Sequence, residues 1–157
     1  MRKLCIILML PALLFSQDLQ KFLDKISYQE SRGSYTVIGG AGGKYIGKYQ
    51  FSNTVLSEIG FNYITVSKFR ANRNIFPPTL QEEAMRLLLK KYEAYLQSEI
   101  NKYAGTKFNG VLITKAGILA AVHGVGYPQV KLYFKGKSTK SSLVMKYLKQ
   151  FSEFTIS

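Results

Sequence analysis

One carboxylate, Glu30, stands directly ahead of a glycine-rich loop in the stretch YQESRGSYTVIGGAGGKYIGKYQF, residues 28–51. On a helix, Glu30 would extend the apolar stripe that contains Leu23 and Ile26. Partial burial and the negative end of the helix dipole both disfavour a charged carboxylate there, so we expect a raised pKa for Glu30. A carboxyl that stays protonated near neutral pH suits the cleavage of a glycosidic bond. The alternative from spacing alone is a solvated residue at a helix end.

The glycine-rich loop also partly matches a phosphate-binding motif. Residues 42–48 fit the G-x-x-x-x-G-K part of a P-loop, but Tyr49 stands where a Ser or Thr must hold magnesium. A P-loop follows a buried strand and opens a helix, whereas a helix is expected to precede this loop. The sequence therefore does not favour nucleotide binding.

The remaining polar residues offer few other catalytic sets. His123 is the single histidine, and the single cysteine, Cys5, lies near the N-terminus. A tetrahedral zinc site would have to recruit the few carboxylates, and a Ser-His-Asp triad would need Asp18 or Asp24, both in or near the helix of Glu30. No metal and no cofactor are expected.

A second catalytic carboxylate is not evident either. A glycoside hydrolase normally places two carboxyls about 5 to 9.5 Å apart around the bond. Asp24 precedes Glu30 on the same helix and is not expected to reach across to a sugar. The other acidic residues are expected on polar helix faces or near the C-terminus: Glu58, Glu82, Glu83, Glu93, Glu99 and Glu153. The sequence therefore predicts a site with one acid.

The first residues have the layout of a secretory signal peptide. Arg2 and Lys3 form a basic start, residues 5–15 are an apolar run, and Ser16 is a small residue at its end. Cleavage after Ser16 would leave residues 17–157 as one domain without cysteine, exported to the periplasm or secreted. The alternative is a buried N-terminal helix.

The formal net charge of +13 suggests an anionic partner. The basic residues are spread along the chain, with only Lys90-Lys91 and residues 135–140 standing out, so a nucleic acid is not favoured. For an exported protein, we expect the anionic surface of the cell envelope as partner, and a monomer. A solvated lysine-rich surface without a partner is the alternative.

Hydrophobic periodicity and turn residues predict a mainly α fold with one small β-hairpin. The expected helices comprise one that ends at Gly33 and others at residues 52–59, 79–102, 115–123 and 142–151. Residues 79–82 read as a capping box that opens the longest helix. Only the segment between Gly33 and Tyr49 is expected to hold strands, with residues 35–37 and 45–46 as the two arms of the hairpin.

Three short motifs carry a resemblance to a known family. Glu30-Ser31 with Gly33 and Tyr35 is followed by residues 47–51, GKYQF, and then by residues 119–124, LAAVHG, with Gly126 and Val130. This order resembles lytic transglycosylases and related lysozyme-like peptidoglycan hydrolases, and the first two motifs also resemble the resuscitation-promoting-factor branch. The resemblance implies an α+β lysozyme-like fold in which the hairpin borders a glycan cleft.

The resemblance also implies roles for individual residues. Glu30 would be the catalytic acid, and Ser31 would help to set its hydrogen bonding. Relatives often read A-A-Y-N-A-G in the third motif, but here Val122 and His123 take the Tyr and Asn positions, so a tyrosine contact with the acid is lost. The residues expected to line the glycan cleft are Tyr45, Tyr49, Gln50, Phe51, His123 and Tyr127.

The reaction implied is cleavage of the bond between N-acetylmuramic acid and N-acetylglucosamine in peptidoglycan strands. Glu30 would protonate the leaving oxygen and then accept the proton of the 6-hydroxyl, which gives a 1,6-anhydro product. The alternatives are a hydrolytic muramidase on the same fold, a glycan-binding module without activity, and a basic protein that binds the envelope surface or nucleic acid.

Overall fold

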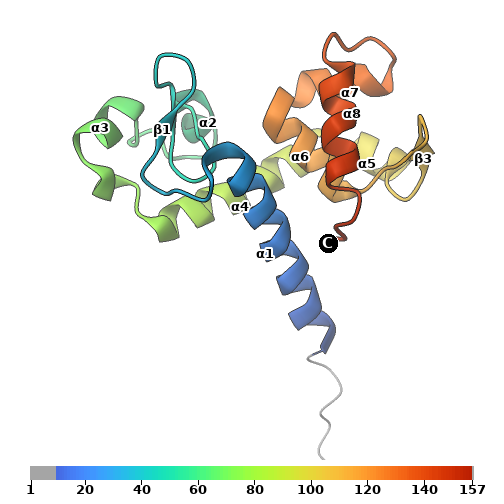
Figure 1. Cartoon of the computed structure of the whole chain (residues 1–157), viewed down its shortest axis with the longest axis horizontal. Helices are drawn as coiled ribbons and strands as arrows, with labels where there is room; N and C mark the ends of the chain where they lie inside the picture. The colour runs from blue at the N-terminus through green and yellow to red at the C-terminus, as the bar shows by residue number, and fades with distance from the viewer. Residues whose placement is uncertain (1–9, 157) are drawn as a thin grey trace, which may run out of the picture. The chain divides into compact units, whose positions relative to one another are not determined.

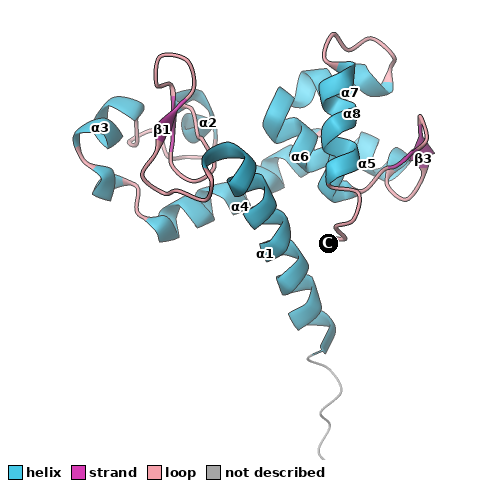
Figure 2. Ribbon diagram, in the orientation of Figure 1, coloured by secondary structure: helices cyan, strands magenta, loops and turns pink. Residues whose placement is uncertain are grey.

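A computed structural model describes residues 10–156 of the chain, with side chains from Gln17 onward. The protein is mainly helical, as predicted, with two small antiparallel strand pairs (Figures 1 and 2). The chain divides into two compact units. We call Asp24–Tyr95 the Glu30 unit, and Leu96–Ser157 together with the residues up to Leu23 the C-terminal unit. That residues 17–157 form a single domain stays a prediction.

Helix α1, Leu10–Ser31, carries Glu30 in its last turn. Its end at Gly33 is confirmed: Arg32 and Gly33 have positive φ angles of 57° and 79°, and the Gly33 amide donates to the Ser27 carbonyl. Residues 1–9 of the predicted signal peptide lie outside the described residues. Of residues 10–16 only the backbone is described, and it forms the start of α1. No helix within residues 10–156 has the length and apolarity needed to cross a membrane.

The Glu30 unit continues from α1 into a hairpin and four further helical segments. These elements are β1 (Ile38–Gly39), β2 (Tyr45–Ile46), α2 (Asn53–Glu58), α3 (Val66–Ala71), the 3-10 helix η1 (Arg73–Ile75) and α4 (Pro78–Tyr95). Ile38 pairs with Ile46 in the antiparallel ladder. The second arm of the hairpin was predicted correctly, but the first lies further along the chain than residues 35–37. Ser52 caps α2 by accepting a hydrogen bond from the Val55 amide.

An aromatic cluster forms much of the core of the Glu30 unit. Phe76 lies at the centre, with its ring centroid 5.5 Å from that of Phe51 and 6.4 Å from that of Phe69. Tyr49 packs on Phe51 at 6.0 Å. The edge-to-face geometry of these pairs is the favoured one for aromatic rings. The loop after β2 is thereby held against the segment that leads into α4.

Besides the first part of α1, the C-terminal unit contains four helices and a second hairpin among its described residues. These elements are α5 (Gln97–Tyr103), β3 (Lys107–Phe108), β4 (Val111–Leu112), α6 (Lys115–Val125), α7 (Tyr127–Phe134) and α8 (Ser141–Gln150). The β3–β4 pair corrects the expectation that strands occur only before Tyr49. The single helix expected over residues 79–102 is divided at Leu96, where the backbone leaves helical geometry at the boundary between the units.

Small residues on α6 allow α8 to pack closely against it. A Cβ at Gly124 would lie 2.2 Å from the ring of Tyr147, and one at Gly117 would lie 3.2 Å from the Leu148 carbonyl. At the C-terminal end of α8, the ring of Phe151 packs 5.6 Å from that of Phe22 of α1. The apolar stripe predicted on the first helix is thus buried at this residue.

Candidate active site

The Glu30 carboxyl is half-buried in the last turn of α1 and is left without a charged partner. Among the side chains of residues 17–156, none forms a hydrogen bond or ion pair with it. Burial raises the pKa of Glu30 above its ordinary value of 4.5. The Glu30 carboxyl interacts electrostatically with Tyr92 of α4. Burial raises the pKa of Tyr92, and the negative charges of Glu58 and Glu30 raise it further. Tyr92 had not been singled out from the sequence.

Ser31 fixes the turn that carries Glu30. Its hydroxyl donates to the Lys48 carbonyl at 2.7 Å and lies 3.3 Å from the Ser27 carbonyl of its own helix. The resemblance implied that Ser31 sets the hydrogen bonding of Glu30. In the structure both acceptors of Ser31 are backbone carbonyls, so Ser31 acts on the position of the helix end.

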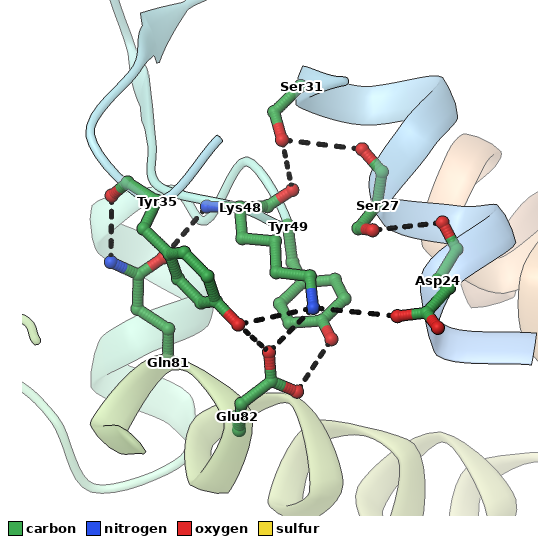
Figure 3. A network of polar contacts seen from close by, with 8 residues as sticks. All are labelled: Asp24, Ser27, Ser31, Tyr35, Lys48, Tyr49, Gln81 and Glu82. Atoms are coloured by element: carbon green, nitrogen blue, oxygen red, sulfur yellow. Dashed lines mark hydrogen bonds and ion pairs between the residues drawn. The ribbon is translucent and has the colours of Figure 1, made fainter. Parts of the chain in front are cut away.

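Lys48 joins three segments of the Glu30 unit (Figure 3). Its Nζ atom lies 2.8 Å from Glu82 Oε1, 3.3 Å from the Tyr35 hydroxyl and 3.7 Å from Asp24 Oδ1. The residue is only 7% exposed, so its charge depends on these partners. A lysine that the sequence placed in a loop motif is therefore an internal link between α1, the hairpin segment and α4.

Glu82 is the carboxylate at the centre of this network, which corrects its assignment to a polar helix face. Its two oxygens accept hydrogen bonds from the hydroxyls of Tyr35 and Tyr49, each at 2.7 Å, in addition to the bond from Lys48. Burial acts to raise the pKa of Glu82, but the hydrogen bonds from Lys48 and the two tyrosines outweigh it and hold the pKa below its ordinary value. Glu82 is thus an anion with an internal structural role.

Gln81 completes the network. The capping box predicted at residues 79–82 is wrong, because Gln81 and Glu82 make these tertiary contacts instead. Gln81 is fully buried. Its Oε1 accepts from the Lys48 amide at 2.7 Å, and its Nε2 donates to the carbonyls of Tyr35 and Phe76 at 2.9 and 2.7 Å. Because α4 begins at Pro78, Thr79 lies inside the helix rather than capping it. The sequence signal that was missed is the position of Gln81 on the apolar stripe of α4, with Ala84 and Leu88.

The aromatic residues predicted beside Glu30 differ in exposure. Tyr49 and Phe51 are 0% and 1% exposed, so they support the loop from inside and present no stacking face. Gln50 adopts a positive φ of 53° and donates from its side chain to the Gly47 carbonyl at 2.9 Å. Tyr45 is 41% exposed and remains available to a ligand.

The two other predicted site residues, His123 and Tyr127, belong to the C-terminal unit. His123 is partly exposed near the end of α6, and the neighbouring Val122 is buried. Tyr127 is 42% exposed and begins α7 directly after Gly126, whose φ is 85°. The helix that continues from Tyr127 was not predicted.

A metal site has no support in the described part of the chain, where no group of three or more His, Cys, Asp or Glu side chains is arranged around a common point.

The chain was also compared with known proteins. Comparison with protein families, with curated proteins and with solved structures found no significant match. The functional assignment therefore depends on the residues themselves.

Proposed function

We propose that this protein is a peptidoglycan lytic transglycosylase with Glu30 as its single acid and base. The observation that carries the proposal is a half-buried carboxyl with a raised pKa and no charged partner, at the end of a helix that Ser31 fixes in place. A general acid must hold a proton near the working pH and must be free to give it up. The resemblance of the three motifs to lytic transglycosylases supplies the substrate class.

In the proposed reaction Glu30 protonates the oxygen that leaves C1 of N-acetylmuramic acid. The acetamido group of the same sugar stabilises the positive charge that develops at C1. Glu30, now a carboxylate, accepts the proton of the 6-hydroxyl as that oxygen bonds to C1. One C–O bond breaks, another forms, no water is consumed, and Glu30 ends protonated as it began. A positioned acid and base of this kind contributes about 10²- to 10⁴-fold to the rate.

Three other carboxylates of the Glu30 unit lie beside a lysine, and this favours single-acid chemistry over hydrolysis. Glu82 is held as an anion by Lys48 and two tyrosine hydroxyls, and Asp24 lies 3.7 Å from the same lysine. Glu58 forms an ion pair with Lys91 at 3.8 Å. Any of these three carboxylates would have to leave such a partner to act as nucleophile or to activate water.

The proposal includes a cellular setting and a fold. The protein is exported after removal of residues 1–16, works on peptidoglycan in the periplasm or outside the cell, and has a lysozyme-like arrangement with a glycan cleft. Its positive charge attracts it to the anionic envelope surface. Of the aromatic residues predicted to line the cleft, Tyr45 and Tyr127 are exposed and can stack on sugars.

The test is digestion of purified peptidoglycan with the wild type, Glu30→Gln and Glu83→Gln, followed by mass spectrometry of the products. Glu83 is an exposed residue of α4, so its variant is the matched control. We expect 1,6-anhydro products, lighter by one water than hydrolysis products, from the wild type and from Glu83→Gln. Glu30→Gln should lose at least about 10²-fold in rate while still binding glycan.

Each other outcome names a different function. Products with a reducing muramic acid would identify a muramidase and would reject the single-acid mechanism. Glycan binding without products from the wild type would identify a binding module. Full activity of Glu30→Gln would reject Glu30 as the catalytic acid.

A further inference from the structure

A polar groove lies in the Glu30 unit, between the tip of the β1–β2 hairpin and the facing parts of α2 and α3. Its volume is about 490 Å³, which lies in the range of small-molecule sites. Two cationic residues line it, Lys44 from the hairpin and Arg70 from α3, and no acidic residue does. The groove therefore offers positive charge that no lining residue neutralises.

The polar side chains of this groove are available to a ligand. Within residues 17–156, where side chains are described, Lys44, Thr54 and Ser67 make no hydrogen bond or ion pair through their side chains. Asn53 uses its Oδ1 atom to accept from the Val66 amide at 2.8 Å, which leaves its NH₂ group as a donor. The groups left for a ligand are thus cations, an amide donor and two hydroxyls.

Arg70 is directed toward the hairpin tip. Its Nη2 atom donates to the Gly43 carbonyl at 3.4 Å, and this guanidinium forms no other hydrogen bond within residues 17–156. A Cβ at Gly43 would lie 2.7 Å from that nitrogen, so glycine allows the close approach. The remaining N–H groups of Arg70 form a planar fork, the geometry that matches a carboxylate or a phosphate.

We infer that this groove binds an oxyanion, the carboxylate or phosphate group of a ligand. Lys44 supplies a mobile point charge, Arg70 a fixed fork, and Asn53, Thr54 and Ser67 complete a set that can donate to the oxygens. The volume exceeds that of a bare ion, so the ligand carries the oxyanion on a larger body, such as a peptide or a polyol. The inference goes beyond the proposed reaction, because it does not depend on Glu30 being catalytic.

The test is a titration of the isotope-labelled full chain, followed by the NMR shifts of the Gly42, Gly43 and Lys44 amides at constant ionic strength. Acetyl-Ala-Glu is the carboxylate probe, glycerol phosphate is the phosphate probe, and glycerol is the neutral control. We expect saturable shifts with at least one anionic probe and none with glycerol. Preference for acetyl-Ala-Glu indicates a carboxylate source, and preference for glycerol phosphate indicates a phosphate source. No saturation with either probe up to about 10 mM would overturn the inference.

Charge-matched double variants separate the groove from the general positive charge. Lys44→Gln/Arg70→Gln should weaken binding by about tenfold or more, since hydrogen bonds to charged groups are strong. Arg86→Gln/Lys90→Gln removes the same charge from exposed residues of α4 and should change the affinity by less than about twofold. Equal weakening in both double variants would reject a specific groove.

A third pair of variants tests the groove without removing a cation. Ser67→Glu places a carboxylate among the lining residues and should abolish anion binding, because the new charge competes for Lys44 and Arg70. Ser57→Glu adds the same charge at an exposed position of α2 outside the groove and should leave binding nearly unchanged. Thermal unfolding of each variant verifies that it is folded. Retained binding in a folded Ser67→Glu variant would contradict the assignment.

Discussion

The Ser31 hydroxyl donates a 2.7 Å hydrogen bond to the carbonyl of Lys48, 17 residues further along the chain. The side chain of the same lysine reaches Glu82 at 2.8 Å on α4. One residue therefore connects the turn that carries Glu30 to the loop through its backbone and to α4 through its ammonium group (Figure 3). The position of the proposed acid depends on this connection, although none of its members touches the Glu30 carboxyl.

Ser31→Ala removes the hydrogen bond that links the end of α1 to the Lys48 carbonyl. The Lys48 carbonyl loses a donor at a part-buried position, so we expect a loss of about 1 kcal/mol in the free energy of unfolding. Activity should fall more than stability implies, because the turn that carries Glu30 is less fixed. Urea unfolding and peptidoglycan turnover measure the two effects. Ser57→Ala, at an exposed position of α2, is the control and should change neither.

Lys48→Met removes the cation that holds Glu82. Because the charge of Glu82 is then left beside two tyrosines without its ion-pair partner, we expect destabilisation by about 3 kcal/mol. Lys91→Met breaks the more exposed pair with Glu58 and should cost less than about 1 kcal/mol. Both values come from urea unfolding at neutral pH.

A second substitution distinguishes loss of the ion pair from loss of packing. In Lys48→Met/Glu82→Gln the uncompensated charge is gone, while an amide oxygen still accepts a hydrogen bond from a tyrosine hydroxyl. We expect the double variant to recover part of the stability lost in Lys48→Met. A double variant that is no more stable than Lys48→Met would contradict the uncompensated charge as the cause and would indicate lost packing.

The sequence predicted the elements whose ends are marked by local chemistry. Gly33 ends α1, Ser52 caps α2, and Thr114 caps α6 by accepting from the Gly117 amide at 3.0 Å. These signals act over three or four residues, so a single sequence reveals them. The raised pKa of Glu30 was predicted in the same way, from the burial of a helix stripe.

The network around Lys48 could not be predicted, because its contacts join residues far apart in the chain. Glu82 and Lys48 are 34 residues apart, and the pattern at 79–82 equally suits a capping box. Tertiary contacts determine that Gln81 and Glu82 join the Lys48 network and do not form a capping box. Tyr49 and Phe51 were assigned to a cleft wall for a related reason: a motif fixes which residues occur together, and packing fixes which of them reach the surface.

Gly47→Ala tests how closely Gln81 approaches the loop. At Gly47 φ is 75° and a Cβ would lie 2.3 Å from Gln81 Oε1. At Gly60 φ is 89° and no atom lies within 4 Å of such a Cβ. Gly60→Ala should therefore cost about 1 kcal/mol from backbone strain alone. Gly47→Ala should cost about 1 to 3 kcal/mol more, because Gln81 must give up its bond to the Lys48 amide. Equal losses in urea unfolding would contradict the close contact.

Glu30→Gln should separate stability from activity through its dependence on pH. Burial raises the folded-state pKa of Glu30 above 4.5, so the folded protein binds this proton more tightly than the unfolded chain. The stability contribution of Glu30 is therefore present below its unfolded pKa and is lost as pH rises through its folded pKa. Since the amide does not titrate, Glu30→Gln should gain stability relative to the wild type as pH rises, while it loses activity.

Glu82→Gln is the control, because its stability relative to the wild type should change with pH in the opposite direction. The folded-state pKa of Glu82 is lowered, so its contribution is present above its unfolded pKa and is lost as pH falls through its folded pKa. Relative to the wild type, Glu82→Gln should lose stability as pH rises from about 3 to about 8. Urea unfolding of the three proteins over this range measures both slopes. A Glu30→Gln difference that stays flat or falls with pH would show that Glu30 is charged in the folded protein, and it would remove the basis for its role as the acid.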